Sequence, residues 1–374
     1  MDSSIKKLGF GLMRLPKVEG GKEADIDKKQ LADMIDLFLE KGFKYFDTAF
    51  MYHDGESEKA VGELLTARHP RDSFLLATKL PMMVINKREQ MEEIFNTQLE
   101  RTRAGYFDRY LIHGIDKRNA QKVDDLDAWG FVRSLKEKGL VRSIGFSFHS
   151  SAEHLDELLT KHPEIEFVQL QINYADWDDE EVQSRLCYEV AEKHGKPITV
   201  MEPVRGGALA AMPEHIRRIL LDAAPDRSVA SWALRFVASL PQVQIVLSGM
   251  SNLEQIKDNI SIFDNFKPLT DEEQKLISKV VEELRKIPTI PCTGCRYCTS
   301  NCPQNIGIPS IIDLYNDYSI YKNLDANLRR YNMMVKGGRG RASDCVECRS
   351  CESACPQNIN ITDILKEAAK VFDK

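Results

Sequence analysis

The sequence lacks the features that mark membrane, secreted and nucleic-acid-binding proteins. No stretch of the 374 residues approaches the roughly 20 apolar residues needed to span a bilayer, and the segment before Pro16 has no apolar run of signal-peptide length. Positive charge is not in excess, because 51 Lys and Arg stand against 57 Asp and Glu, a formal net charge of −6. Such a chain has no sequence-wide attraction to nucleic acid or anionic lipid. We therefore expect a cytoplasmic protein that binds neither nucleic acid nor membranes.

Cysteine is nearly absent from the first three quarters of the chain. Cys187 stands alone there, on an expected helix, where a small buried hydrophobic residue is the ordinary interpretation. The other eight cysteines form two groups near the C-terminus. This distribution excludes a disulfide framework spread over the chain and indicates metal binding.

Short β-branched or apolar runs alternate with longer amphipathic stretches from the start of the chain to about Pro288. This alternation predicts repeated βα units and a parallel sheet. The eight expected strands are 8–13, 45–47, 74–79, 110–113, 142–147, 167–172, 199–201 and 244–248. Eight units in roughly 260 residues favour a (β/α)8 barrel over residues 1–286. An open doubly wound sheet is the alternative, which the missing G-x-G-x-x-G between the first strand and helix disfavours.

The remaining residues, 287–374, contain the motif C-x-x-C-x-x-C-x-x-x-C-P twice. Three thiolates two residues apart can wrap one corner of a cubane, whereas the fourth, followed by proline, reaches the other cluster. Zinc held by C-x-x-C pairs is the alternative. We therefore expect two [4Fe-4S] clusters with crossed ligands. The two ligand sets are Cys292, Cys295, Cys298 with Cys355, and Cys345, Cys348, Cys351 with Cys302.

The segment between the two cysteine groups is helical over 310–321 in our interpretation. The tail is similar to the α-helical kind of ferredoxin domain, so a small, mainly helical ferredoxin-like domain is expected. Residues 327–343 carry five basic side chains and no acid. They form either a solvated loop or a docking surface for an acidic electron-transfer protein. The basic residues are Arg329, Arg330, Lys336, Arg339 and Arg341.

Four polar side chains lie near the ends of neighbouring expected strands. Asp47 ends the second strand, and Tyr52 follows five residues later. Lys79 ends the third strand and His113 ends the fourth. Reactive groups of such barrels lie at the C-terminal ends of the strands, so we expect the four to converge. An ammonium held by a carboxylate can stabilise a tyrosinate, which makes the phenol a usable acid and predicts a catalytic set.

The segments around these residues resemble the aldo-keto reductase superfamily over roughly residues 5–265. The resemblance implies that Tyr52 donates a proton to a carbonyl oxygen that His113 orients. It also implies that Lys79, held by Asp47, lowers the pKa of Tyr52. NAD(H) or NADP(H) across the barrel mouth would exchange the hydride with a small carbonyl or alcohol. The matching phrases are FDTAFMYHDGESEKAVGELL, LLATKL, YLIHGID, GLVRSIGFSFHS, EFVQLQINY and SGMSNLEQIKDNI.

The same resemblance implies contacts to the nicotinamide ring. Ser147 and Gln169 occupy positions that hold the carboxamide, although Phe148 replaces the usual Asn. Met201 stands where an aromatic residue normally stacks on the ring. Met is flexible and polarisable enough to cover a ring.

The phosphate contacts depart further from the family pattern. Glu202, Arg205 and Gly206 suggest either a loop packed against a phosphate or an internal ion pair. In the segment after the eighth strand, no Lys or Arg stands where relatives hold the adenosine 2'-phosphate, so NADPH loses its usual clamp. The expected contacts there are Ser248, Gly249, Met250, Ser251, Gln255 and Asn259.

The two halves of the chain differ in how they handle electrons. A nicotinamide gives two electrons as a hydride, whereas each cluster passes one, and FMN can mediate between them. Three functions are therefore open. They are nicotinamide-linked carbonyl reduction or alcohol oxidation with an iron–sulfur tail, a flavin-containing reductase fed by a ferredoxin or flavodoxin, and a non-catalytic docking or regulatory barrel. The intact catalytic set argues against the last and favours an enzyme.

Overall fold

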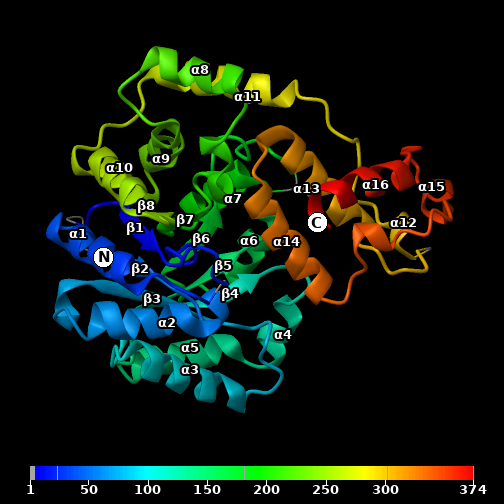
Figure 1. Ribbon diagram of the computed structural model, residues 1–374. Helices are drawn as coiled ribbons and strands as arrows, with labels where there is room; N and C mark the ends of the chain where they lie inside the picture. The colour runs from blue at the N-terminus through cyan, green and yellow to red at the C-terminus, as the bar shows by residue number, and fades with distance from the viewer. Residues whose placement is uncertain (1–4, 23, 181, 301, 374) are drawn as a thin grey trace. The chain divides into compact units, whose positions relative to one another are not determined.

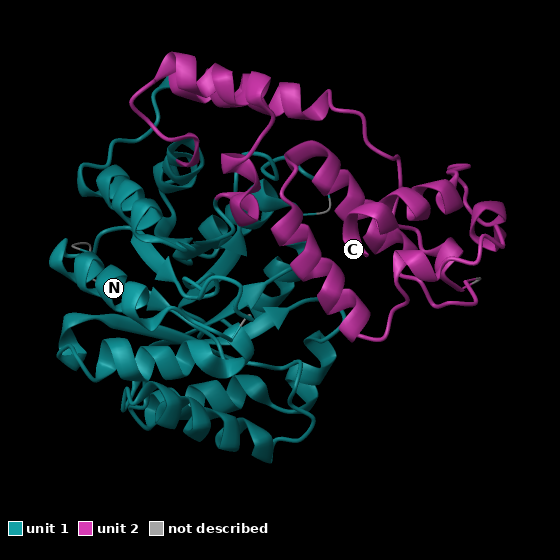
Figure 2. Ribbon diagram, viewed as in Figure 1, with its two compact units in different colours: residues 1–203, 231–271 teal, residues 204–230, 272–374 magenta. Residues whose placement is uncertain are grey.

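The computed structural model describes residues 5–22, 24–180, 182–300 and 302–373. The chain divides into two compact units (Figure 2). The first comprises residues 1–203 and 231–271, and the second comprises 204–230 and 272–374. The second unit thus combines 204–230 with all residues from 272 onward, and its limits do not coincide with residue 286. The expected boundary between barrel and tail at residue 286 stays a prediction.

Eight parallel strands of the first unit close into a barrel in chain order, with helices outside it (Figure 1). This confirms the (β/α)8 barrel and rules out the open sheet. All eight strands overlap the expected segments, although β4 is several residues longer at both ends, where it pairs with β5. The strands are β1 (Leu8–Gly11), β2 (Tyr45–Asp47), β3 (Leu75–Leu80), β4 (Phe107–Ile115), β5 (Val141–Phe148), β6 (Phe167–Gln171), β7 (Ile198–Met201) and β8 (Val243–Ser248).

The strands read as continuous apolar runs because both faces of the closed sheet are covered. Inside the barrel, Tyr45, Leu111, Phe167 and Ile245 pack together with neighbouring apolar side chains. Gly145 makes room for this layer, since a Cβ there would lie 2.6 Å from the Phe167 carbonyl oxygen. The interior is therefore a packed core, and polar side chains collect at the strand ends.

The helices of the first unit bury one apolar face each. In α1 the Asp27 carboxylate caps the Gln30 N–H, and Met34 and Phe38 are fully buried. The ring of Phe38 lies 5.6 Å from that of Phe10 on β1, which fixes this helix against the sheet. The helices are α1 (Lys28–Glu40), α2 (Glu56–Val61), α3 (Glu89–Thr102), α4 (Ala120–Asp125), α5 (Ala128–Glu137), α6 (Ala152–Lys161), α7 (Ser184–Lys193), α9 (Val229–Ser239, which begins in the second unit) and α10 (Leu253–Asp264).

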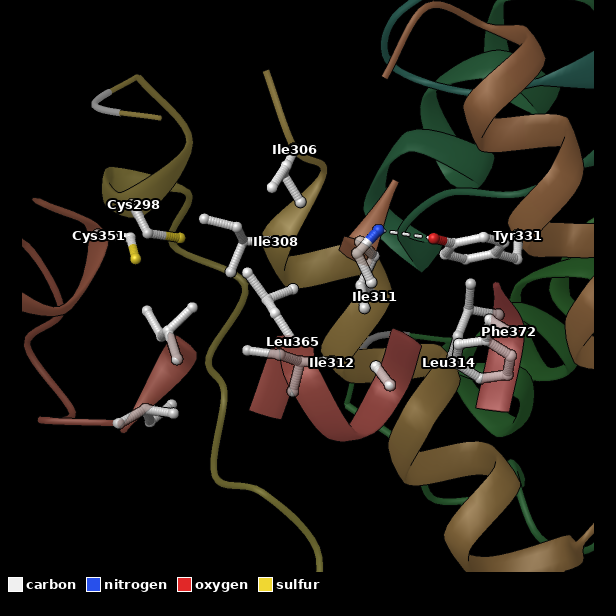
Figure 3. Close-up of a cluster of buried hydrophobic side chains, with 14 residues drawn as sticks. Cys298, Ile306, Ile308, Ile311, Ile312, Leu314, Tyr331, Cys351, Leu365 and Phe372 are labelled. Carbon is white, nitrogen blue, oxygen red and sulfur yellow. Dashed lines mark hydrogen bonds between the residues drawn. The ribbon is translucent and has the colours of Figure 1, made fainter. Parts of the chain in front are cut away.

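The second unit is mainly helical, as the tail's resemblance implies. Isoleucine, leucine and aromatic side chains build its core, and the sulfurs of Cys298 and Cys351 lie at one end of that core (Figure 3). Tyr331 is fully buried and accepts a hydrogen bond from the Ala342 N–H at 2.6 Å. The helices are α8 (Glu214–Ala223), α11 (Asp271–Arg285), α12 (Tyr297–Ser300), α13 (Ile308–Tyr321), α14 (Leu324–Lys336), α15 (Ser350–Ser353) and α16 (Ile361–Phe372).

Across the described ranges, no helix combines the length and the hydropathy that a membrane span requires.

Candidate active site and cluster sites

A buried ion pair lies at the C-terminal end of the barrel. Asp47 ends β2, and Lys79 lies on the neighbouring strand β3 with 1% of its surface exposed. The Lys79 ammonium donates to Asp47 Oδ1 at 2.6 Å, to the Thr48 carbonyl oxygen at 2.8 Å and to the Tyr52 hydroxyl at 3.3 Å. Burial lowers the pKa of Lys79, but Asp47 and then Tyr52 raise it by more. The ammonium therefore stays charged, with all three of its N–H bonds directed at oxygens.

Tyr52 opens the short turn η1 (Tyr52–Gly55) that follows β2. The next residue, His53, has a left-handed backbone and accepts a hydrogen bond from the Leu15 N–H at 3.2 Å, which anchors the turn. Burial raises the pKa of Tyr52 above its usual value, while Lys79 acts in the opposite direction. The resemblance implies that the pKa of Tyr52 is lowered overall. In the structure, the effect of burial on this pKa is larger than the opposing effect of the Lys79 ammonium. Tyr52 is thus protonated at neutral pH, and Lys79 favours the tyrosinate once the proton has left.

His113, on β4, faces Tyr52 across the mouth. The two ring centroids lie 6.2 Å apart with the ring planes nearly perpendicular. Burial, with smaller contributions from Lys79 and His149, lowers the pKa of His113 to about 3. Its Nδ1 is buried and has no hydrogen-bond partner among the residues that the structure describes. A neutral imidazole with a vacant nitrogen can bind a carbonyl oxygen or carry a proton.

A buried polar network behind Lys79 was not predicted from the sequence. The Gln98 amide donates to the Lys79 carbonyl oxygen at 3.0 Å and to the Glu58 carboxylate at 2.9 Å. Tyr110 donates to the Gln98 side-chain oxygen at 2.7 Å, and Thr78 donates to Glu58 at 2.8 Å. Glu58 and Gln98 are fully buried. Because charged and amide side chains on amphipathic helices normally face water, the sequence pattern carries no signal for this network.

The predicted carboxamide contacts lie side by side within the barrel mouth. Ser147 on β5 is paired in register with Gln169 on β6, and they are 1% and 2% exposed. Gln169 Oε1 is buried without a hydrogen-bond partner among the described residues, which fits an incoming amide N–H. Phe148 packs against Phe146 instead, with ring centroids 6.0 Å apart. It does not take over the Asn role at this position.

The predicted phosphate segment after β8 is tied into its own loop. Asn259 donates to the Ser248 hydroxyl at 2.8 Å, and the Ser251 N–H donates to Gln255 Oε1 at 2.7 Å. Met250 is fully buried. A cation that the sequence did not reveal lies beside this segment, because a Cβ on Gly249 would meet the Arg14 side chain at 2.9 Å.

Met201 and Glu202 stand where the first unit's seventh strand ends. Met201 is the last residue of β7 and is partly exposed. Glu202 is exposed and has a φ of 56°, and its carbonyl oxygen accepts a hydrogen bond from buried Asn173 at 3.3 Å.

Arg205 and Gly206 belong to the second unit. The Arg205 guanidinium pairs with Asp317 on α13 and lies 4.8 Å from the centroid of the Tyr321 ring. Asn323 donates to the Gly206 carbonyl oxygen at 3.3 Å. An ion pair of Arg205 was one of the two sequence interpretations, and within the second unit the structure supplies Asp317 as a partner.

Removal of the Arg205 charge distinguishes a structural role from a phosphate ligand. Arg205→Met leaves the Asp317 carboxylate, 10% exposed, without its cation. We expect the free energy of unfolding of the second unit to fall by about 2–3 kcal/mol. An anaerobic urea titration followed by cluster absorbance measures it. Arg330→Met is the control, since its pair with Asp313 is at least half exposed, and we expect about 1 kcal/mol or less. Unchanged stability with weaker dinucleotide binding would instead assign Arg205 to a phosphate.

Two cavities in the second unit bring the cysteines of the repeated motif together. One is lined by Cys292, Cys295, Cys298 and Cys355. The other is lined by Cys302, Cys345, Cys348 and Cys351. Each cavity takes three cysteines from one motif and the last from the other, which is the crossed arrangement that the spacing predicts.

The donor set fits a cluster better than a single ion. Among the described residues, none of these eight cysteines forms a disulfide. Within the described residues, no three His, Cys, Asp or Glu side chains approach closely enough to hold one metal ion. Four cysteines around one shared cavity fit a cubane, whose irons carry thiolates at its corners.

Comparison with known proteins agrees with both halves of this description. Residues 7–282 match the aldo/keto reductase family, and residues 291–359 match a 4Fe-4S dicluster domain. An aldo-keto reductase of Mycolicibacterium vanbaalenii is 30% identical over 265 residues, which cover 70% of this chain and 84% of that protein. An uncharacterised oxidoreductase of Bacillus subtilis is 25% identical over 74% of this chain and 92% of its own length.

Solved structures share the barrel. An aldo-keto reductase from Bacillus halodurans, in its holo form, is 26% identical with a TM-score of 0.58, over 73% of this chain and 91% of that one. An aldo-keto reductase from Klebsiella pneumoniae in complex with NADPH has a TM-score of 0.60 at 19% identity, over 74% and 91% of the two chains, and shows the shared fold. The chain belongs to the aldo/keto reductase family of oxidoreductases and carries a C-terminal 4Fe-4S dicluster domain.

Proposed function

We propose that the protein transfers a hydride between a nicotinamide dinucleotide and a small carbonyl or alcohol at the barrel mouth, and single electrons through its dicluster domain. The observation that carries the first part is the Lys79 ammonium held between the Asp47 carboxylate and the Tyr52 hydroxyl. A buried, charged ammonium beside a phenol favours proton release from that phenol, which carbonyl reduction requires.

Each residue of the set has a distinct task in this reaction. Tyr52 holds the proton that is delivered to the carbonyl oxygen, and Lys79 stabilises the tyrosinate that remains. Neutral His113 orients the carbonyl oxygen through a ring nitrogen. Ser147 and Gln169 would hold the carboxamide of a bound nicotinamide, whose chemistry is to supply the hydride.

The eight grouped cysteines would hold the two [4Fe-4S] clusters, and a small electron-transfer protein is their proposed partner. The basic stretch 327–343 presents less uncompensated positive charge to a partner than its sequence suggests. The reason is that Arg330 pairs with Asp313 and Arg341 pairs with Asp373. FMN has no support in the matched families or relatives. We also propose that the protein acts in the cytoplasm, where thiol ligands stay reduced.

Dinucleotide choice tests the proposed reaction. A 2'-phosphate gains most from a bidentate Arg, and no Lys or Arg occupies the usual positions between Gly249 and Gln255. We expect Kd values for NADH and NADPH, measured by fluorescence titration of the anaerobic protein, to agree within about tenfold. If neither NADH nor NADPH binds with a Kd in the micromolar range, the proposed function is contradicted.

Arg14 is the side chain to vary in the same titration, because it lies against Gly249. A preference for NADPH of about a hundredfold, abolished in Arg14→Leu, would contradict the expected parity and identify Arg14 as the clamp. Lys257→Leu is the control, since Lys257 lies one turn into α10 and carries the same charge.

A further inference from the structure

A second histidine stands beside His113 at the barrel mouth. His149 directly follows β5. Its backbone N–H donates to the carbonyl oxygen of Ile115, the last residue of β4, at 2.9 Å. One step earlier, the Gly114 N–H donates to the Ser147 hydroxyl at 2.7 Å. These two hydrogen bonds tie the ends of β4 and β5 together. They therefore hold His113 and His149 on adjacent strand ends.

The packing of β5 places His149 on the interior face of the barrel. Successive side chains of a strand point to opposite faces. Phe146 contacts Trp129 of α5, and Phe148 contacts His154 of α6, so these two residues face the outer helices. Ser147 and His149 consequently face inward. Ser147 is buried and His149 is exposed, which places His149 at the water-facing end of that inner face.

Charged groups from several elements act electrostatically on the His149 imidazole. Burial lowers the pKa of His149 most, Glu202 after β7 and Asp116 after β4 raise it, and Arg118 lowers it further. His149 in turn lowers the pKa of His113, and Glu202 acts electrostatically on Tyr52. Both imidazoles are therefore neutral at pH 7.

Glu202 is held in place at the cost of backbone strain. Its φ of 56° is unusual for a residue other than glycine, and such conformations persist where the surroundings impose them. Buried Asn173 donates to its carbonyl oxygen at 3.3 Å. The backbone of Glu202 is thus held in place, and the Glu202 carboxylate favours the protonated form of the His149 imidazole electrostatically.

We infer that His149 is a proton relay residue, which passes protons from water through His113 to Tyr52 during carbonyl reduction. The inference rests on the proposed function. In that reaction the hydride forms the new C–H bond, the carbonyl π bond breaks, and the Tyr52 proton forms the new O–H bond. Tyr52 is left as a tyrosinate. His113 then gives it a proton and accepts one from His149 through intervening water, and His149 takes one from solution, so that one proton leaves solution per carbonyl reduced.

A single-turnover experiment separates this role from substrate binding. Anaerobic protein in excess is mixed with benzaldehyde and NADPH in weak buffer at pH 8. NADPH fluorescence reports hydride transfer, and an indicator dye reports proton uptake. In the wild-type protein we expect the two signals to change together. In His149→Ala we expect hydride transfer at the wild-type rate and proton uptake slowed at least about tenfold, with added imidazole restoring it.

Matched variants complete the test. His149→Gln keeps a hydrogen-bonding side chain that cannot carry a proton in this way, and should behave like His149→Ala. His215→Ala removes an exposed histidine on α8 and should leave both signals unchanged. Proton uptake that keeps pace with hydride transfer in His149→Ala would overturn the relay, and so would an equal slowing of hydride transfer. If no carbonyl compound causes the wild-type protein to oxidise NADPH, the proposed function is wrong, and the inferred relay is then wrong as well.

Discussion

Tyr52→Phe is expected to lower carbonyl turnover at least ~100-fold, because it removes the proton donor and keeps the ring. Tyr52 is the hydroxyl that receives a hydrogen bond from the buried Lys79 ammonium. The loss should appear in kcat, measured as NADPH oxidation with a saturating aldehyde. The Kd of the dinucleotide should change little, since the phenol is not among the expected cofactor contacts.

Tyr106→Phe is the matched control, because Tyr106 is a partly buried tyrosine of the same unit that lies under the Arg71 guanidinium. It should keep wild-type turnover. Lys79→Met should be similarly harmful to Tyr52→Phe, but it also leaves Asp47 buried without its cation, and folding must be verified first. Wild-type turnover in Tyr52→Phe would place the chemistry elsewhere.

The convergence of the proposed catalytic residues could be predicted from the sequence because barrel geometry makes strand ends meet. Asp47, Lys79 and His113 each stand at or near the end of a strand that periodicity detects, and a closed parallel barrel brings such ends to one mouth. The direction of the Tyr52 pKa could not be predicted in the same way. It depends on how completely the surroundings exclude water, which no local pattern records.

Contacts between distant segments were missed for a related reason. Arg14 lies against Gly249, and Arg205 pairs with Asp317, in each case across more than a hundred residues of chain. Periodicity identifies which face of an element is buried, but not which distant side chain it meets. Phe148 shows the limit of resemblance as well, because strand alternation turns it toward the outer helices at a position where relatives carry Asn.

The grouping of the motif cysteines could be predicted more fully, because thiolate spacing carries geometric information. Three cysteines at intervals of three residues bind one cluster, and a fourth followed by proline leaves in another direction. The structure groups Cys302 with the second motif and Cys355 with the first. The crossing makes each cluster depend on both motifs, so the two motifs cannot be separated without breaking both clusters.

Cys302→Ala is expected to remove one cluster and spare the other. Wild-type anaerobic protein should contain about eight irons and eight sulfides per chain, and the variant about half of each. The reason is that Cys302 lines the cavity formed by Cys345, Cys348 and Cys351, so only that cluster loses a ligand. Alanine is used because a serine oxygen could still bind iron. Cys187→Ala should keep the full content, since Cys187 is buried on α7 far along the chain from both motifs.

A pair of double variants decides whether the ligands cross. Cys302 and Cys345 serve one cluster if they do, so Cys302→Ala with Cys345→Ala should still retain about four irons. Cys302→Ala with Cys298→Ala should then retain almost none, because Cys298 lines the other cavity. Uncrossed ligands would reverse the two results, since Cys302 would then share a cluster with Cys298. Because both double variants lose two cysteines from the same small unit, a general loss of stability lowers the iron content of both and cannot mimic either pattern.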